Sequence, residues 1–241
     1  MNAPFGSRND PARVLMHADD FWMLKQSGAF DRYIKSELLE GELWGCPRAE
    51  NEREQSDAVF PIKLRVEDYE RLDRTGALQK YGRTELINGA IYRMSPQHRP
   101  HGFAKDELAY RLRRKLEELG SSLRVATEQS VLLSPHSEPQ PDIILTTEPR
   151  GKGAIPGASV ALIVEVPVTT LEFDLGEKAD LYAAAGVPEY WVVDLNENRV
   201  LLHANPRSDG SGYDGQLDVL FGEPLHAATV EGLLVDTTGL D

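Results

Sequence analysis

PQPDIILTT (139–147) and SVALIVEV (159–166) are the two clearest strand signals in this chain. Both contain an apolar run rich in β-branched residues, and turn-forming residues flank the first run, so two buried strands are predicted. Asp142 begins the first strand and Glu165 ends the second. If the strands are antiparallel neighbours, these ends meet and both carboxylates lie at one end of a sheet. Like charges held close together are unfavourable unless a cation or a proton lies between them.

Each carboxylate has two interpretations. Mg²⁺ prefers a few carboxylate oxygens, retained waters and substrate phosphates, which suits two acids on neighbouring strand ends. In the ordinary interpretation Asp142 caps a turn after Pro141, and Glu165 points to solvent from a strand end. The local sequence leaves both interpretations open.

The stretch DLGEKADLYAAAGVP (174–188) predicts a helix. Asp174 and Glu177 form a start that is similar to a capping box, and a glycine and a proline end the helix. Lys178 would then lie in the first turn, where the helix dipole disfavours a cation. This misplaced charge hints at function, whereas the ordinary explanation is a surface lysine paired with Asp174 four residues earlier.

The remaining elements predict an α/β (α+β) fold, a mixed β-sheet flanked by helices. Strands are expected at 123–133 and 189–194, and the second continues through a turn into a strand at 199–203. Residues 101–119 predict an amphipathic helix with a leucine stripe. Basic residues concentrate on and before this helix, which indicates a solvated face or a phosphate-facing surface: Arg93, Arg99, Arg111, Arg113, Arg114 and Lys115.

The front of the chain contains an internal repeat. GAFDRYIKSELLEGELW (28–44) aligns without a gap with GALQKYGRTELINGAIY (76–92), at an offset of 48 residues. The repeat predicts a duplicated unit of one short helix and a β-hairpin, and Asn88-Gly89 is a strong tight-turn signal. Only the second copy continues into the strands with Asp142 and Glu165. We therefore expect an N-terminal extension at 1–60 and one domain at 61–241. The extension is expected to cover a sheet edge, to pack against the site or to form a partner interface.

Composition excludes some classes of protein. The net charge of −13 argues against tight non-specific binding of duplex DNA, although a local basic patch can still bind phosphates. Cys46 is the only cysteine, so no intramolecular disulfide is expected. No stretch resembles a signal peptide or a membrane helix. We expect a soluble, cytoplasmic protein.

Several segments in order resemble the Uma-two family of the PD-(D/E)XK nuclease superfamily. The resemblance covers the chain from about Pro61 to its end, and its motifs are YGRTELINGAIYRMSP (81–96), a helix led by His101, PQPDIIL (139–145), LIVEV (162–166) and GEKADLYAAAGVPEYWVVD (176–194). It implies a restriction-endonuclease-like core. Pro167 occupies the position at which the superfamily usually carries its lysine, and residues 167–170 depart from the loop of relatives.

The resemblance also implies site residues. Asp142, Glu165 and the carbonyl of Val166 would hold Mg²⁺ or Mn²⁺, with Lys178 as the catalytic lysine. Glu85 of the ELING turn is our candidate for a third acid, and a solvent-facing glutamate in a hairpin is its ordinary interpretation. His101, Arg99 and Arg114 are candidate substrate contacts. The implied function is metal-dependent endonucleolytic cleavage of DNA, for which a homodimer is one arrangement. The alternative, which the acidic charge, residues 167–170 and the extra repeat all allow, is an inactive interaction protein that retains the fold.

Overall fold

The computed structural model describes residues 11–49, 56–95 and 98–240. The chain divides into two compact units. The repeat unit consists of Ala12–Met94 with Pro135–Ser137, and the sheet unit contains Ser95–Ser134 and Glu138–Asp241. The sheet unit carries the strands with Asp142 and Glu165, so the candidate site is built within it.

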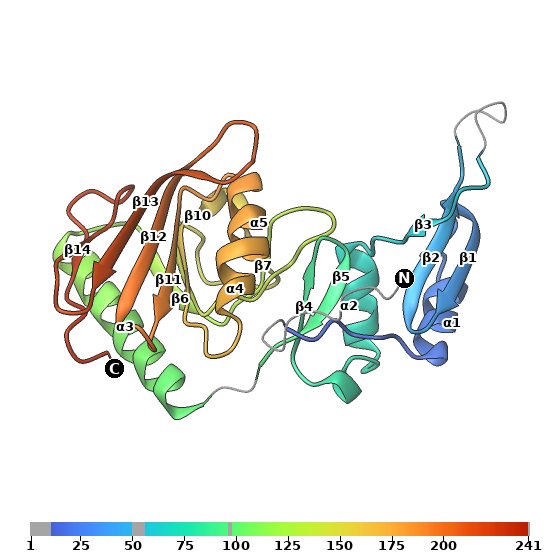
Figure 1. The fold of residues 1–241 in the computed structure, drawn as a ribbon, viewed down its shortest axis with the longest axis horizontal. Coiled ribbons are helices and arrows are strands. Elements are labelled where there is room, and N and C mark those ends of the chain that lie inside the picture. Colours follow the sequence, from blue (N-terminus) through green and yellow to red (C-terminus); the bar gives the residue numbers. More distant parts are fainter. Residues whose placement is uncertain (1–10, 50–55, 96–97, 241) are drawn as a thin grey trace. The chain divides into compact units, whose positions relative to one another are not determined.

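The sheet unit has a mixed six-stranded sheet in the order β13-β12-β11-β10-β8-β6 (Figure 1). β10 is parallel to β11 and antiparallel to β8, and every other neighbouring pair is antiparallel. These strands are β6 (Arg124–Thr127), β8 (Ile143–Thr146), β10 (Val160–Glu165), β11 (Glu189–Asp194), β12 (Arg199–Pro206) and β13 (Tyr213–Leu220). The predicted mixed sheet with flanking helices is confirmed.

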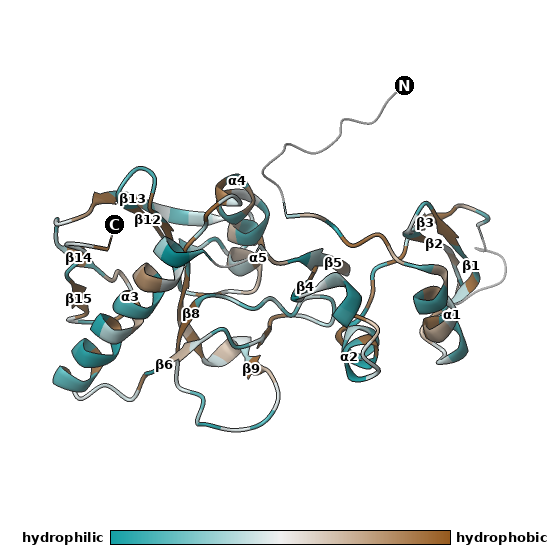
Figure 2. Cartoon of the chain, turned by 90° about the horizontal axis from the view of Figure 1, so that it is seen from below, coloured by the Kyte–Doolittle hydropathy of each residue, from teal (hydrophilic) through white to brown (hydrophobic). Residues whose placement is uncertain are grey.

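Side chains of the central strands alternate between two apolar layers, as the pleat requires. Ile143 and Leu145 belong to the core cluster that contains the buried face of α3 (Arg99–Glu118), whereas Ile144 belongs to the cluster that contains Tyr182. Figure 2 shows hydrophobic strands beside an α3 whose outer face is hydrophilic. Both faces of the central strands are therefore covered, which explains why their sequences read as continuous apolar runs.

The parallel strands β10 and β11 are joined by a helical crossover that begins earlier than predicted. It consists of α4 (Leu171–Phe173), a π-helical turn (Asp174–Lys178) and α5 (Ala179–Ala184). The prediction of a start at Asp174 was wrong, and Lys178 lies within the helical segment. The Asp174–Glu177 spacing is therefore not a capping box, because backbone N–H of Asp174 already bonds to the carbonyl of Thr170.

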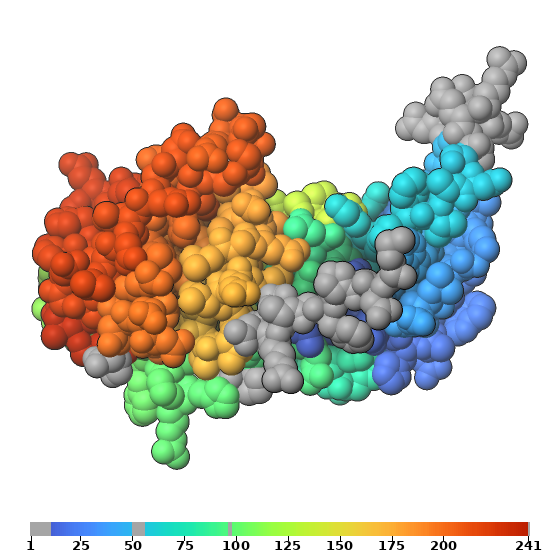
Figure 3. Space-filling view, viewed as in Figure 1, coloured from blue at the N-terminus to red at the C-terminus, as the bar shows by residue number. Residues whose placement is uncertain are grey.

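The predicted strand at 123–133 is interrupted. Glu128 has a positive φ of 53°, a backbone conformation that ends β6 before β7 (Val131–Leu132) begins. β7 pairs with β9 (Ile155–Pro156), which precedes a 3₁₀ turn (Gly157–Ser159). The C-terminal pair β14 (Leu225–His226) and β15 (Leu234–Val235) completes the unit. Figure 3 shows the C-terminal residues of the unit, in orange and red, on the face in view.

The repeat unit confirms the duplication predicted at an offset of 48 residues. The helices α1 (Ala18–Gln26) and α2 (Val66–Arg74) have equivalent bounds, and a hairpin follows each of them. The first hairpin is β1 (Tyr33–Leu39) with β2 (Glu42–Pro47), and the second, after a 3₁₀ turn (Gln79–Tyr81), is β4 (Thr84–Ile87) with β5 (Ala90–Arg93). β3 (Phe60–Pro61) pairs with β2.

The two copies contact each other reciprocally. Asp20 of the first copy pairs with Lys80 of the second at 2.8 Å, and the equivalent Asp68 of the second copy pairs with Arg32 of the first at 3.7 Å. The segments that lead into the helices cross in the same way: Val14 N–H donates to the carbonyl of Ile91, and Ile62 N–H to that of Leu43. This is the contact pattern of a two-fold dimer, built here within one chain.

The turn glycines of both hairpins are tightly constrained. Gly41 and Gly89 have φ values of 85° and 81°. A Cβ atom on Gly41 would lie 2.6 Å from Leu15 Cβ, and one on Gly89 would lie 2.5 Å from Lys63 Cβ, the equivalent residue of the second copy. Each turn therefore requires glycine for its backbone conformation and for the close approach of the entering segment.

One hydrophobic core joins the copies, with Phe21 and Leu43 from the first and Leu72 and Leu86 from the second. The expected boundary at residue 60 follows the sequence repeat, whereas the compact units divide after Met94. Much of the polar segment between the copies, residues 50–55, lies outside the described residues. No helix in the described part of the chain is long and apolar enough to cross a bilayer.

The unequal reciprocal pairs predict unequal stability effects. Asp20 is 2% exposed and also accepts a hydrogen bond of 2.8 Å from Tyr81, so Asp20→Asn should lower the free energy of unfolding by about 2 kcal/mol. Asp68→Asn should lower the free energy of unfolding by about half as much, because the ion pair of Asp68 with Arg32 is longer. Urea denaturation followed by tryptophan fluorescence measures both. Glu70→Gln, in an exposed pair with Arg74, is the control, and equal losses in all three variants would contradict the assignment.

Candidate active site

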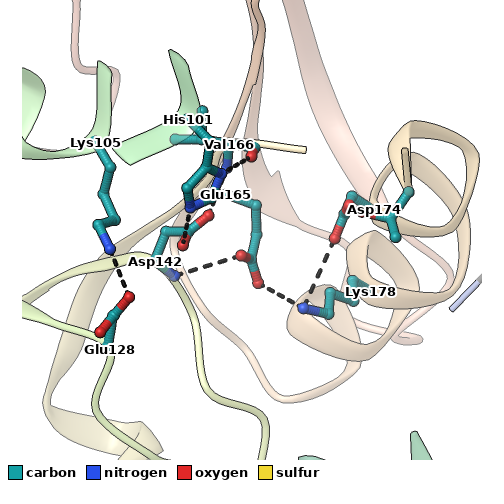
Figure 4. A network of polar contacts seen from close by, with 9 residues as sticks. His101, Lys105, Glu128, Asp142, Glu165, Val166, Asp174 and Lys178 are labelled. Carbon is teal, nitrogen blue, oxygen red and sulfur yellow. Dashed lines mark hydrogen bonds and ion pairs between the residues drawn. The ribbon is translucent and has the colours of Figure 1, made fainter. Parts of the chain in front are cut away.

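Asp142 and Glu165 meet at one end of the sheet because of the register of β8 and β10. Val164 lies opposite Ile143 in this antiparallel pair, so the next position along brings Glu165 opposite Asp142. Asp142 N–H donates to Glu165 Oε2 at 3.4 Å, and Val166 N–H donates to Asp142 Oδ2 at 2.9 Å (Figure 4). The backbone of each strand end thus holds the carboxylate of the other.

Glu165 faces the helical crossover. It is 5% exposed, so the interpretation in which it points to solvent is wrong. Its Oε1 atom accepts hydrogen bonds from Lys178 Nζ at 2.8 Å and from the Tyr182 hydroxyl at 2.9 Å. A buried carboxylate is tolerated only when such donors compensate for lost hydration.

Lys178 is buried between two carboxylates. It is 5% exposed, 2.8 Å from Glu165 and 3.7 Å from Asp174. The predicted pairing with Asp174 is present, but Lys178 is buried, so its interpretation as a surface lysine is wrong. The Thr170 hydroxyl donates a hydrogen bond of 2.5 Å to the Asp174 carboxylate. Asp174 and Lys178 are the first and last residues of the π-helical turn. Such turns are frequent at functional sites.

His101 of α3 contacts two of the predicted metal-binding groups. Its Nδ1 atom lies 2.6 Å from the carbonyl oxygen of Val166, and its Nε2 atom lies 3.2 Å from Asp142 Oδ1. Burial lowers the pKa of His101, but the Asp142 carboxylate and the Val166 carbonyl together raise it above its ordinary value. The Nε2 atom is buried and lacks a well-aligned hydrogen bond among the described residues.

Lys105 and Glu128 lie beside these groups and were missed by sequence reasoning. Lys105 is 5% exposed and forms an ion pair of 2.5 Å with Glu128. Glu128 N–H also donates to the carbonyl of Asp142 at 3.2 Å. This bond links Glu128, whose φ is positive, to the segment that carries the Asp142 carboxylate. A signal was present: Lys105 follows His101 by four residues and falls on the apolar stripe of the helix.

The other predicted residues take no part in the contacts described above. Glu85 is buried on β4 of the repeat unit and stays a prediction as a third acid. Arg99 is exposed at the start of α3. Arg114 is exposed and pairs with Glu118 at 3.1 Å, so its guanidinium already has a carboxylate partner.

The donor set suits a hard cation. Asp142, Glu165 and the Val166 carbonyl offer oxygen atoms, and the poorly satisfied Nε2 atom of His101 marks an incomplete polar environment beside Asp142. In the described part of the chain, no three His, Cys, Asp or Glu side chains gather as a metal-binding group. A cation here would therefore depend on waters and substrate phosphates, which is how Mg²⁺ is usually held.

The model of the Uma2 family, described as "Putative restriction endonuclease", matches residues 66–236. This chain belongs to the Uma2 family. The match covers more than two thirds of the chain and includes the second copy of the repeat, the carboxylate pair and Lys178, whereas the first copy precedes it. The Uma-two resemblance seen in the sequence motifs is thereby confirmed.

A solved structure supports the fold of this Uma2 protein. The crystal structure of "a putative nuclease belonging to DUF820" from Anabaena variabilis ATCC 29413 superposes with a TM-score of 0.52 and 14% sequence identity. The match covers 65% of this chain and 88% of that one. At this identity the likeness concerns the fold alone. No curated protein matches the chain.

The buried charges predict strong coupling between Lys178 and Glu165. Lys178→Met leaves Glu165 and Asp174 buried without the amine, so the free energy of unfolding should fall by about 3 kcal/mol. Glu165→Gln should partly restore stability in the Lys178→Met background, because it removes one of the uncompensated charges. Chemical denaturation of both single variants and the double variant measures this coupling, and additive losses would show that the pair is not coupled.

Proposed function

We propose that this Uma2 protein is a metal-dependent DNA endonuclease whose site is centred on Asp142, Glu165 and Lys178. The observation that carries the proposal is the reciprocal bonding of two carboxylates, buried Glu165 and partly exposed Asp142, with an amine 2.8 Å from Glu165. Such a group of charges is costly to bury for stability alone. Family membership supports nuclease activity, and the oxygen donors support a divalent cation.

Asp142, Glu165 and the carbonyl of Val166 would hold Mg²⁺ or Mn²⁺. The cation, when bound, supplies positive charge to a phosphate and makes a water molecule more acidic. The protein fixes the two carboxylates in advance through the Asp142 and Val166 N–H groups. This preorganisation reduces the rearrangement needed when substrate arrives.

Lys178 contributes a cation from the helical crossover. Its amine lies 2.8 Å from Glu165 and 3.7 Å from Asp174, and the Tyr182 hydroxyl donates a hydrogen bond to the same Glu165 oxygen. We assign Lys178 to stabilising the negative charge that develops on the phosphate during hydrolysis, or to orienting the attacking water. Its place in the crossover compensates for Pro167, which cannot supply an amine.

His101 is assigned a positioning role in this proposal. Its ring bridges the Asp142 carboxylate and the Val166 carbonyl, and so it holds the two strand ends from the α3 side. This role differs from the expected contact with substrate. It follows from burial, because His101 is 7% exposed.

Cleavage assays with purified full-length protein test the proposal. DNA should be cut in the presence of Mg²⁺ or Mn²⁺, and Asp142→Asn or Glu165→Gln should abolish the cutting. Lys178→Met should reduce the rate about 100-fold or more, because it removes charge stabilisation from the transition state. Asp180→Asn is the matched control, since this carboxylate is exposed on the same helical crossover. Unchanged cleavage by both Asp142→Asn and Glu165→Gln would refute the site.

Calorimetric titration with Mn²⁺ separates an enzyme from an inactive protein that retains the fold. Wild-type protein should bind the cation, and Asp142→Asn should bind it at least about tenfold more weakly because one charged ligand is lost. Identical titrations, together with absence of cleavage, would favour the inactive interaction protein. Circular dichroism of each variant checks that the fold is retained.

A further inference from the structure

We propose that a groove along the edge strand β6 binds the phosphate backbone of a nucleic-acid strand and leads it to the carboxylate pair. The inference rests on the proposed nuclease function and adds where the substrate lies. The groove has a volume of about 670 Å³ and is lined by α3, β6 and the loop between β8 and β9, all of which belong to the sheet unit. Figure 2 shows that loop as largely hydrophilic.

The charge of the groove is opposite to that of the protein. Arg113, Arg124, Arg150 and Lys152 line it together with two carboxylates, Glu117 and Glu148. Four cations and two anions leave two positive charges, in a chain with a net charge of −13. A local positive surface of this kind attracts a polyanion even when the whole molecule is acidic.

These four cations are available for a ligand. Within the described residues, none of the four side chains forms an ion pair or a hydrogen bond. The basic residues beside Arg113 on α3 differ: Arg111 pairs with Glu107, and Arg114 and Lys115 pair with Glu118. Arg113 thus lines the groove without a partner among the described residues, whereas these three neighbours are paired and lie outside it.

The groove runs toward the candidate site. In the antiparallel pair of β6 and β8, Arg124 lies opposite Thr146, and Thr127 lies opposite Ile143, next to Asp142. Thr127 and Gln129 also line the groove, on either side of Glu128, which bonds to Asp142. A strand that follows β6 from Arg124 would therefore reach the carboxylates at its far end.

The lining indicates which part of the nucleic acid is bound. It contains charged, small polar and aliphatic side chains but no aromatic residue. Base stacking needs aromatic platforms, whereas phosphates need cations. We therefore assign the groove to the sugar–phosphate backbone, bound without sequence preference.

Fluorescence anisotropy with labelled single-stranded and duplex oligonucleotides, in EDTA to prevent cleavage, tests the groove. Neutralising n phosphates gives a salt slope of about −0.9n for duplex DNA, so four cations predict a slope of about −3.6. Arg150→Ala/Lys152→Ala should reduce the slope by about 2 and weaken binding about tenfold at low salt. These exposed residues can be replaced without disturbing the core.

Arg207→Ala is the matched control, because its side chain is paired with the Asp214 carboxylate and lies outside the groove. This variant should bind like wild type. An unchanged slope in the double variant, or no binding by wild type, would overturn the groove. Cleavage assays separate the two proposals: salt-dependent binding without cleavage keeps the groove and refutes the nuclease, whereas cleavage that is unaffected in the double variant keeps the nuclease and refutes the groove.

Discussion

The antiparallel register of β8 and β10 is the constraint on which the candidate site depends. It places Asp142 opposite Glu165, and each strand end donates a backbone N–H to the other carboxylate. If β8 slipped by one residue along β10, Asp142 and Glu165 would lie on opposite faces of the sheet, because the side-chain period of a strand is two. The apolar layers on both sides of the sheet fix this register, so the packing of the core also positions the polar groups.

Two helical segments complete the polar network from opposite faces of the sheet. α3 supplies His101 and Lys105, and the crossover supplies Lys178 and Tyr182. Lys178 and Tyr182 compensate for the burial of Glu165, which otherwise carries a large desolvation cost. β10 and β11 are parallel, so the chain between them must cross over the sheet. The crossover helix begins close to the end of β10 and so brings Lys178 and Tyr182 to Glu165.

The repeat unit shows a different use of symmetry. Its copies exchange equivalent ion pairs and entering segments, as subunits of a two-fold dimer do, but a single chain provides both partners. The Uma2 match begins at residue 66 and contains only the second copy. The first copy lies outside this match but contributes to the hydrophobic core of the repeat unit.

The sequence by itself determined the strands at 143–146 and 160–165, the duplication and the choice of Asp142, Glu165 and Lys178, because these depend on periodicity, turn residues and motifs. Only the tertiary structure decided that Glu165 is buried, that Lys178 lies in a π-helical turn, and that Lys105 joins Glu128. It also distinguished Arg113 in the groove from its neighbour Arg114. Local sequence cannot provide these answers, since burial and ion pairing depend on residues that are distant along the chain.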